Sequence, residues 1–247
     1  MPYVASGCGA ARVLAAVALG LVGGLGCFAE AANACDGYSY AGVQDARAAS
    51  GIRATLVEVA VPGVARGHVA AWVGVGGPGQ GAGGRDAWIQ IGLNALSDGV
   101  SRLYFEIDRP GPGPDYEELA ADVAVGSRYE VAVLELPSRP GWWQVSLNGA
   151  AVSEPVELPG SSRWRPMAVA ESWVGARHAC NTFAYRFENV AVALRSSGAW
   201  SALVDGYRFR AAGYRMHRET GRTFLVSSTT NPRPPLRLGA REREGGP

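Results

Sequence analysis

The sequence has almost no excess charge and few of the residues that usually bind metals. Its 23 basic and 22 acidic residues leave a formal net charge of +1, which gives no reason to expect a nucleic-acid partner. The three histidines, His68, His178 and His217, show neither an H-E-x-x-H motif nor another metal-ligand spacing. We therefore expect no nucleic-acid partner, no metal and no other cofactor.

Common nucleophile and nucleotide motifs are also missing. The sequence has no G-x-S-x-G elbow and no G-x-x-x-x-G-K-[ST] loop. Residues Gly74–Gly79 fit G-x-G-x-x-G formally, but Pro78 and further glycines follow where a nucleotide-binding fold needs a helix. We interpret Gly74–Gly84 as a connection between strands that overhangs a cleft. A Ser–His–Asp triad, which is recognised by geometry alone, stays open.

Long amphipathic helices are absent from most of the chain, and this absence favours an all-β fold. The 34 glycines and 15 prolines separate short runs rich in valine, tryptophan and tyrosine. About nine or ten such runs predict an antiparallel β-sandwich or jelly roll of the concanavalin A type. A chain of 247 residues is long enough to bury one full core of this kind.

The N-terminus resembles a targeting segment. Arg12 precedes an apolar run from Val13 to Phe28, and Ala32-Asn33-Ala34 follows as a cleavage signal. We expect a signal peptide over residues 1–34, a secreted or cell-surface protein, and no stable membrane span after processing. A membrane anchor is the alternative, although the run is short for a span. Lipid attachment at Cys27 is a further alternative, but the preceding residues match a lipidation box poorly.

Cysteine usage agrees with export. Cleavage would remove Cys8 and Cys27 and leave Cys35 and Cys180, an even number in an oxidising compartment. We predict one Cys35–Cys180 disulfide, which could stabilise the fold by about 4–5 kcal/mol in the chain-entropy view.

The mature chain divides by composition. Residues 35–195 carry the strand pattern and are assigned to the sandwich domain. Residues 196–228 form an Arg-rich C-terminal extension with extra strands between Trp200 and Ser227. Residues 229–247 are expected to be a disordered tail, because their Pro, Arg, Glu and Gly content cannot bury enough apolar surface.

Several local features are also predicted. Asn148-Gly149 is the strongest hairpin signal in the chain. The others are an edge strand at Tyr38–Gln44, a turn at Pro62-Gly63, a helical turn at Tyr116–Ala121 and a β-bulge near Asn189.

One strand, Met167–Trp173, carries a polar anomaly. Met167, Val169, Glu171 and Trp173 alternate onto one face, which is apolar except for Glu171. A lone buried charge is very costly, so this carboxylate must be paired, neutralised or functional. The pairing alternative is an arginine across the sheet, with Arg102, Arg128, Arg165 and Arg186 as candidates.

Two further strands share the anomaly. Ala87–Leu93 places Gln90 beside Trp88 on the face opposite Ile89 and Ile91. Arg102–Ile107 likewise places Glu106 beside Tyr104. We expect Gln90 and Glu171 to meet in one cleft with an aromatic floor of Trp72, Trp88, Tyr104 and Trp173. The plainer interpretation is that the aromatic residues belong to the core.

The order of these motifs resembles the glutamic peptidases, or eqolisins. The resemblance spans about residues 68–193 and departs from the family where Ser172 separates Glu171 from Trp173. The matching segments are Trp72-Val73-Gly74, Trp88-Ile89-Gln90-Ile91-Gly92, Tyr104-Phe105-Glu106, Ala170-Glu171-Ser172-Trp173 and Phe187-Glu188-Asn189-Val190.

The resemblance implies a lectin-like β-sandwich in which Gln90 and Glu171 form a catalytic dyad. Trp72, Trp88, Tyr104, Glu106 and Trp173 are then expected to bind substrate. The first hypothesis is an exported acid endopeptidase acting on polypeptides. The second is a non-catalytic lectin-like module that binds glycan or protein, and the third is a structural protein of the cell envelope.

Overall fold

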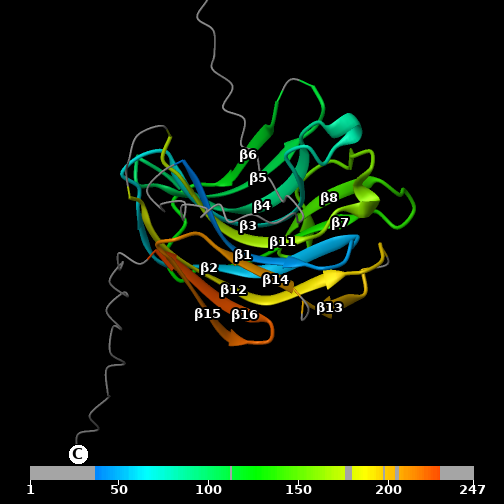
Figure 1. Ribbon diagram of the computed structural model, residues 1–247. Coiled ribbons are helices and arrows are strands. Elements are labelled where there is room, and N and C mark those ends of the chain that lie inside the picture. Colours follow the sequence, from blue (N-terminus) through cyan, green and yellow to red (C-terminus); the bar gives the residue numbers. More distant parts are fainter. Residues whose placement is uncertain (1–36, 112, 176–179, 197, 204–205, 229–247) are drawn as a thin grey trace, which may run out of the picture.

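The predicted antiparallel β-sandwich is confirmed. The computed structural model describes residues 37–111, 113–175, 180–196, 198–203 and 206–228. These residues form two stacked sheets, and Figure 1 labels most of their strands.

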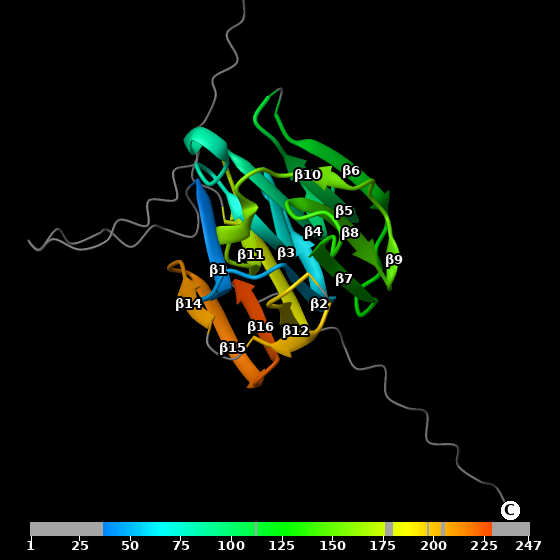
Figure 2. The ribbon, with the colours of Figure 1, turned by 90° about the vertical axis from the view of Figure 1, so that its right-hand side faces the viewer.

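The first sheet has seven strands within the described residues, and all of its pairings are antiparallel. In spatial order they are β14 (Gly206–Arg210), β1 (Tyr38–Asp45), β11 (Met167–Trp173), β3 (His68–Gly77), β4 (Ala87–Leu96), β5 (Ser101–Asp108) and β6 (Asp115–Ala120). The central strands β11, β3 and β4 lie side by side in Figure 2 as well.

The second sheet has nine strands in the described part of the chain. Its main path is β10 (Val156–Glu157), β8 (Trp142–Leu147), β7 (Arg128–Glu135), β2 (Gly51–Gly63), β12 (Thr182–Ala193), β16 (Thr223–Ser228) and β15 (Tyr214–Thr220). Two short strands lie off this path: β9 (Ala150–Ala151) pairs with β8, and β13 (Trp200–Ala202) pairs with β12.

Helical structure in the described residues is limited to two short 3-10 turns. They are η1 (Ala82–Gly84), after β3, and η2 (Ser161–Arg163), before β11. Neither has the length and hydropathy that crossing a bilayer as a helix requires.

The core fills the space between the two sheets. Strand β4 contributes Ile89, Ile91 and Leu93, all fully buried, because alternate side chains of a strand point to the same face. The opposite sheet contributes Phe187 and Trp143, whose indole nitrogen donates to Ser161 Oγ at 2.9 Å. Burying side chains of this size contributes about 1.5–3 kcal/mol each. The core therefore uses one face of the first sheet and leaves the other face available for a site.

The large and small residues of β11 divide as the alternation predicts. Ala168 and Ala170 belong to the core between the sheets, whereas Met167, Val169 and Glu171 lie on the outer face. Small core residues let this central strand approach the second sheet closely. The larger side chains are left to build the outer face.

Some local predictions are confirmed. Asn148 and Gly149 connect β8 and β9 with positive φ values of 50° and 81°, as a tight hairpin requires. The bulge near Asn189 appears as a shift of the β12–β2 register between Glu188 and Ala191.

Others are wrong. Residues 115–120 form strand β6 instead of a helical turn, because β5 offers an unpaired edge that this polar segment pairs with. Pro62 and Gly63 end β2 instead of turning the chain. Strand β1, expected at an edge, is interior because β14 pairs with its outer side.

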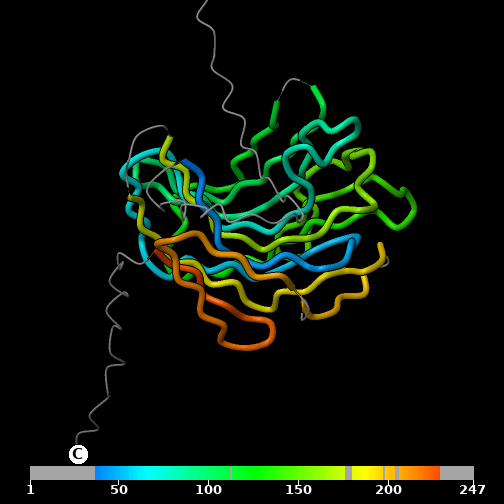
Figure 3. The backbone as a smooth tube through the Cα atoms, viewed as in Figure 1, coloured from blue at the N-terminus to red at the C-terminus, as the bar shows by residue number. Residues whose placement is uncertain are grey.

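The segment after residue 196 supplies strands to both sheets. β14 pairs with β1, while β16 pairs with β12 and β15 with β16. Figure 3 shows this orange and red part of the chain lying against both layers. The extra strands expected between Trp200 and Ser227 therefore extend the sandwich itself.

Several predictions fall on residues outside the described ranges. They concern the signal peptide over 1–34, including Cys8 and Cys27, the tail over 229–247, and Cys35. The Cys35–Cys180 disulfide, export and the tail's disorder therefore stay predictions.

Candidate active site

Strand β3 lies between the two strands that carry the predicted dyad. Glu171 of β11 pairs opposite Ala70 of β3, and Gln90 of β4 pairs opposite Gly74 on the other side of β3. Trp72 lies midway between Ala70 and Gly74 on the same face. Gln90 and Glu171 thus share one face, but they lie on strands separated by β3 and four register positions apart along it, with Trp72 between them.

This face of the first sheet is hollowed into a groove of about 1090 Å³. Its volume is at the upper end of the range for ligand sites, and an extended chain of several residues would fit. Six of the seven residues predicted as catalytic or substrate-binding line it: Trp72, Trp88, Gln90, Tyr104, Glu106 and Glu171. The sequence alternation therefore predicted which of these side chains face the groove.

Two ring nitrogens hold the carboxyl group of Glu171. The indole nitrogen of Trp72 donates to Oε2 at 3.0 Å, and Nε2 of His68 lies 3.0 Å from Oε1. The Glu171 side chain is only 11% exposed. The cost of burying it is therefore offset by one donor or partner at each oxygen.

The arginine alternative for Glu171 is not what the structure shows. Three of the four candidate arginines bond other acids: Arg102 bonds Asp98 and Glu118, Arg128 bonds Glu188, and Arg186 bonds Glu219. The carboxylate of Glu171 faces the groove with His68 and Trp72 instead.

Two glycines make room for these side chains. A Cβ on Gly92 would lie 2.1 Å from the carbonyl oxygen of Ala71 and 2.7 Å from the Cβ of Trp72. A Cβ on Gly74 would lie 2.8 Å from the Cβ of Gln90. Any larger residue at these two positions would overlap with Trp72 or Gln90 and displace it.

Gln90 is oriented by an aromatic pair. Its Nε2 donates to the hydroxyl of Tyr104 at 3.2 Å, and the Tyr104 ring stacks on Tyr116 with 5.2 Å between ring centroids. Burial raises the pKa of Tyr104 well above its usual value, so the phenol stays neutral and can accept this hydrogen bond. The amide is thereby fixed where it faces the groove.

Glu106 is a second carboxyl group in the groove, directly across from Gln90 in the β4–β5 register. Trp88 Nε1 donates to its Oε1 at 2.8 Å. Burial raises the pKa of Glu106, and the negative charge of Glu171 adds to that effect, while His68 and the Trp88 bond oppose it. The groove thus contains two acids that influence one another.

Trp173, the seventh predicted residue, lies beside the groove instead of lining it. Its ring packs against His68 and Tyr38, with centroid distances of 5.7 and 6.0 Å. It therefore supports the wall next to Glu171.

Sequence reasoning missed several groove residues. The sequence pattern offers His68 only as a metal ligand, and it offers Tyr38 and Tyr40 only as part of an edge strand. The β1–β11 register sets Tyr40 opposite Glu171. Burial, with the charges of Glu171 and Glu106 adding to it, raises the pKa of Tyr38 to about 12. The alternation of tyrosines 38 and 40 was the signal that could have identified this wall.

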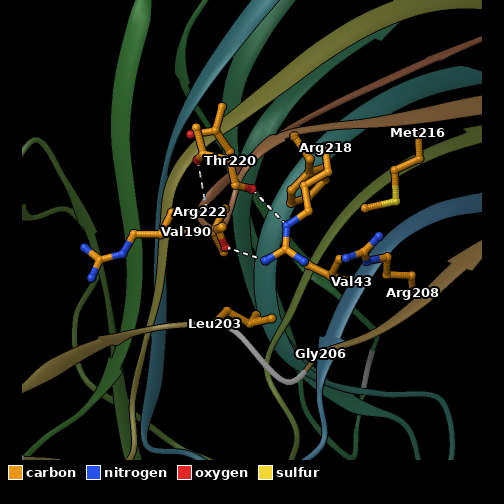
Figure 4. Close-up of a pocket in the computed structure, with 12 residues that line it drawn as sticks. Val43, Val190, Leu203, Gly206, Arg208, Met216, Arg218, Thr220 and Arg222 are labelled. Carbon is orange, nitrogen blue, oxygen red and sulfur yellow. Dashed lines mark hydrogen bonds between the residues drawn. The ribbon is translucent and has the colours of Figure 1, made fainter.

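A second hollow lies at the edge of the sandwich between β14 and β15. Its lining includes Arg208, Arg218 and Met216, and Arg218 donates to the backbone oxygens of Thr220 and Gly221 (Figure 4). Its volume of about 30 Å³ corresponds to about one water molecule, which makes it too small for a peptide or sugar. Among the described residues, no group of three or more His, Cys, Asp or Glu side chains is placed to hold a metal ion.

No protein-family model and no curated protein sequence matches the chain. Solved structures of glutamic peptidases do match its fold, and each match covers 78% of this chain and 98% of the other. Scytalido-glutamic peptidase with a transition-state analogue inhibitor aligns with a TM-score of 0.56 at 15% identity. The same peptidase with a peptide-based transition-state analogue gives 0.56 at 14%.

The third match is SCP-B, described as a member of the eqolisin family of peptidases and solved in complex with the tripeptide Ala-Ile-His. It aligns with a TM-score of 0.52 at 14% identity. The fold resemblance expected from the sequence is therefore confirmed. At identities this low the structural match shows the fold alone. The chemistry must therefore be argued from the residues of the groove.

Proposed function

We propose that this protein is an exported, acid-acting endopeptidase of the glutamic type. The observation that carries the proposal is the location of Gln90 and Glu171 on one groove face, on either side of Trp72, in a sandwich with the fold of glutamic peptidases. Glu171 is the general acid and base, and Gln90 orients the attacking water.

The chemistry needs one group that exchanges a proton and one that stabilises charge. Glu171 takes a proton from water as the water oxygen attacks the peptide carbonyl carbon. It returns this proton to the leaving amine nitrogen as the C–N bond breaks. Gln90 can accept a hydrogen bond with its carbonyl and donate one with its amide, so it can hold the water and the developing oxyanion. Water and peptide become a carboxylic acid and an amine.

The groove supports a polypeptide as the substrate. Trp72, Trp88 and Tyr104 give it an apolar lining, and Gln90 and Glu106 supply polar groups beside them. Such a surface can grip side chains of an extended peptide while the polar groups fix its backbone. The expected signal peptide over residues 1–34 is the basis for proposing a secreted or cell-surface location.

Digestion of an unfolded protein substrate between pH 2 and 7 tests the function. Wild type should cleave in the acid range. Glu171→Gln should lower kcat by at least roughly 100-fold through loss of the proton acceptor. Gln90→Ala should lower kcat by roughly 100-fold or more through loss of oxyanion stabilisation.

Glu219→Gln is the matched control, because Glu219 forms an exposed ion pair with Arg186 on the second sheet, far from the groove lining. It should keep wild-type activity, and circular dichroism should show all variants folded. Undiminished acid digestion by folded Glu171→Gln protein would refute the glutamic mechanism.

An aromatic groove is also the usual surface of a sugar-binding site, so a lectin-like module is the second candidate. Trp88, which is partly exposed in the groove, would then stack on a sugar ring, whereas Trp72 and Tyr104 are only 8% and 3% exposed. Glycan-array binding that survives both Glu171→Gln and Gln90→Ala, in a protein with no proteolytic activity, would favour this candidate.

A further inference from the structure

The backbone around His68 is held in place at the start of β3. Asn181, almost fully buried, donates through Nδ2 to the carbonyl oxygens of His68 and Arg66, at 3.2 and 2.9 Å. The imidazole packs against Trp173 at a centroid distance of 5.7 Å and meets the Tyr38 ring edge-on at 6.1 Å. This ring is therefore presented to Glu171 in a defined position.

The two oxygens of Glu171 have different kinds of partner. The Trp72 indole can only donate, so Oε2 always accepts a hydrogen bond. The imidazole nitrogen at Oε1 can donate to a carboxylate or accept from a carboxylic acid. Either partner of the Oε1–Nε2 contact can therefore carry the shared proton. Each oxygen keeps a further lone pair for a water proton.

Other titratable groups share the groove with His68. From β1, Tyr38 and Tyr40 have pKa values raised chiefly by burial, so both phenols stay neutral at acid and neutral pH. From β5, Glu106 is close enough for His68 to lower its pKa, against a larger upward effect of burial. Arg102 lines the same groove, but its guanidinium bonds Asp98 and Glu118. His68 is therefore the basic group in direct contact with Glu171.

We propose that His68 is a positioning residue for the cleavage reaction, which holds Oε1 of Glu171 and, as an imidazolium, keeps Glu171 in the carboxylate form that accepts the water proton in acid. This inference rests on the proposed function. A charged partner 3.0 Å away favours the ionised carboxylate, whereas a neutral partner would only orient it. Losing the orientation of Glu171 and losing the charge of His68 should therefore have separate effects on the reaction.

Two variants separate these effects. His68→Ala removes both, so kcat should fall roughly tenfold or more and the acid limb of the kcat/KM profile should move up by about one pH unit. His68→Gln retains a side-chain amide that can donate to Oε1 without a charge. It should recover part of kcat but leave the acid limb at the His68→Ala position. KM should change little in both, because His68 acts through Glu171.

His217→Ala is the matched control, since His217 is exposed on β15 of the second sheet. It should leave both kcat and the pH profile unchanged. Folded His68→Ala protein whose acid limb coincides with that of wild type would overturn the proposal, whatever its kcat.

A second measurement keeps the inference testable without activity. The chain has three histidines, so the ring signals can be assigned by NMR. The pH titration of the His68 ring should differ between wild type and Glu171→Gln, while that of His217 should not. Identical His68 titrations would refute the coupling. If the coupling is present but no substrate is cleaved, the proposed function fails and the His68–Glu171 pair stands.

Discussion

At the scale of single residues, the groove holds its acids through indole nitrogens. Trp72 donates to Glu171, and Trp88 donates to Glu106 in the same way. An indole N–H cannot accept a proton and carries no charge, so it orients a carboxyl group and favours its ionised form through the hydrogen bond alone, as Trp88 does for Glu106. The two tryptophans first identified as a floor for substrate are therefore also structural partners of the acids.

Trp72→Phe tests the orienting role, because it keeps an aromatic ring and removes the donor. We expect kcat to fall roughly tenfold, since a hydrogen bond to a charged group contributes about 1.5 kcal/mol or more. KM should change much less. Steady-state kinetics on a peptide substrate measures both.

Trp142→Phe on the second sheet is the control and should keep wild-type kinetics. A Trp72→Phe enzyme with unchanged kcat would show that this hydrogen bond does not contribute to the reaction.

At the scale of elements, the alternation of side chains along each strand predicted which residues would face the groove. In β4, β5 and β11 the core accepts alternate side chains, so Ile89, Leu103 and Ala170 point inward while Gln90 and Glu171 point outward. A buried face imposes this alternation on the sequence directly.

Pairing partners and register could not be predicted in the same way. The His68–Glu171 contact joins residues 103 positions apart and depends on β3 lying next to β11. Strand β6 pairs by its backbone at an edge, and most of its side chains are exposed, so its sequence carries no alternation. Edge strands and long-range registers are set by tertiary contacts that a local pattern does not encode.

Close packing of β3 on β4 provides a test at this scale. Gly92→Ala should destabilise the protein by about 1–3 kcal/mol, because the new methyl group meets the Ala71 carbonyl oxygen and Trp72. Displacement of Trp72 should also lower kcat. Thermal unfolding and kinetics measure the two effects.

Gly221→Ala is the control, since its new Cβ would find only the end of the Arg218 side chain at 3.7 Å. An equal loss of stability in the two variants would contradict the close-approach explanation.

At the scale of the whole molecule, a buried acid outside the groove makes stability depend on pH. Glu58 of β2 is 1% exposed, and burial raises its pKa from 4.5 to about 7, against a smaller opposing effect of Ser101. Among the described residues, neither its Oε2 nor the nearby Tyr185 hydroxyl has a hydrogen-bond partner. The folded protein therefore prefers Glu58 protonated.

The resulting stability is fully present below pH 4.5, where Glu58 is protonated in both the folded and the unfolded chain. As pH rises from 4.5 to about 7, the unfolded chain ionises first and stability falls, by about 3 kcal/mol. Glu58→Gln should remove most of this slope. Denaturant unfolding at pH 4 and pH 7.5 measures it.

Glu130→Gln, at an exposed position on β7, should keep the wild-type slope. A Glu58→Gln protein that loses as much stability as wild type between the two pH values would show that Glu58 is not the responsible group. The proposed acid activity and this stability profile have separate origins and would favour the same environment.

Strand β14 has a practical consequence for anyone who shortens this chain. A fragment ending near residue 195, where composition suggests a boundary, would lose Tyr207 and Phe209 from one side of the groove and would uncover the backbone of β1. It would also strip β15 and β16 from the opposite layer. If such a fragment were inactive or insoluble, the loss of strands from both sheets would explain the result. The experiment would then say nothing about the catalytic residues.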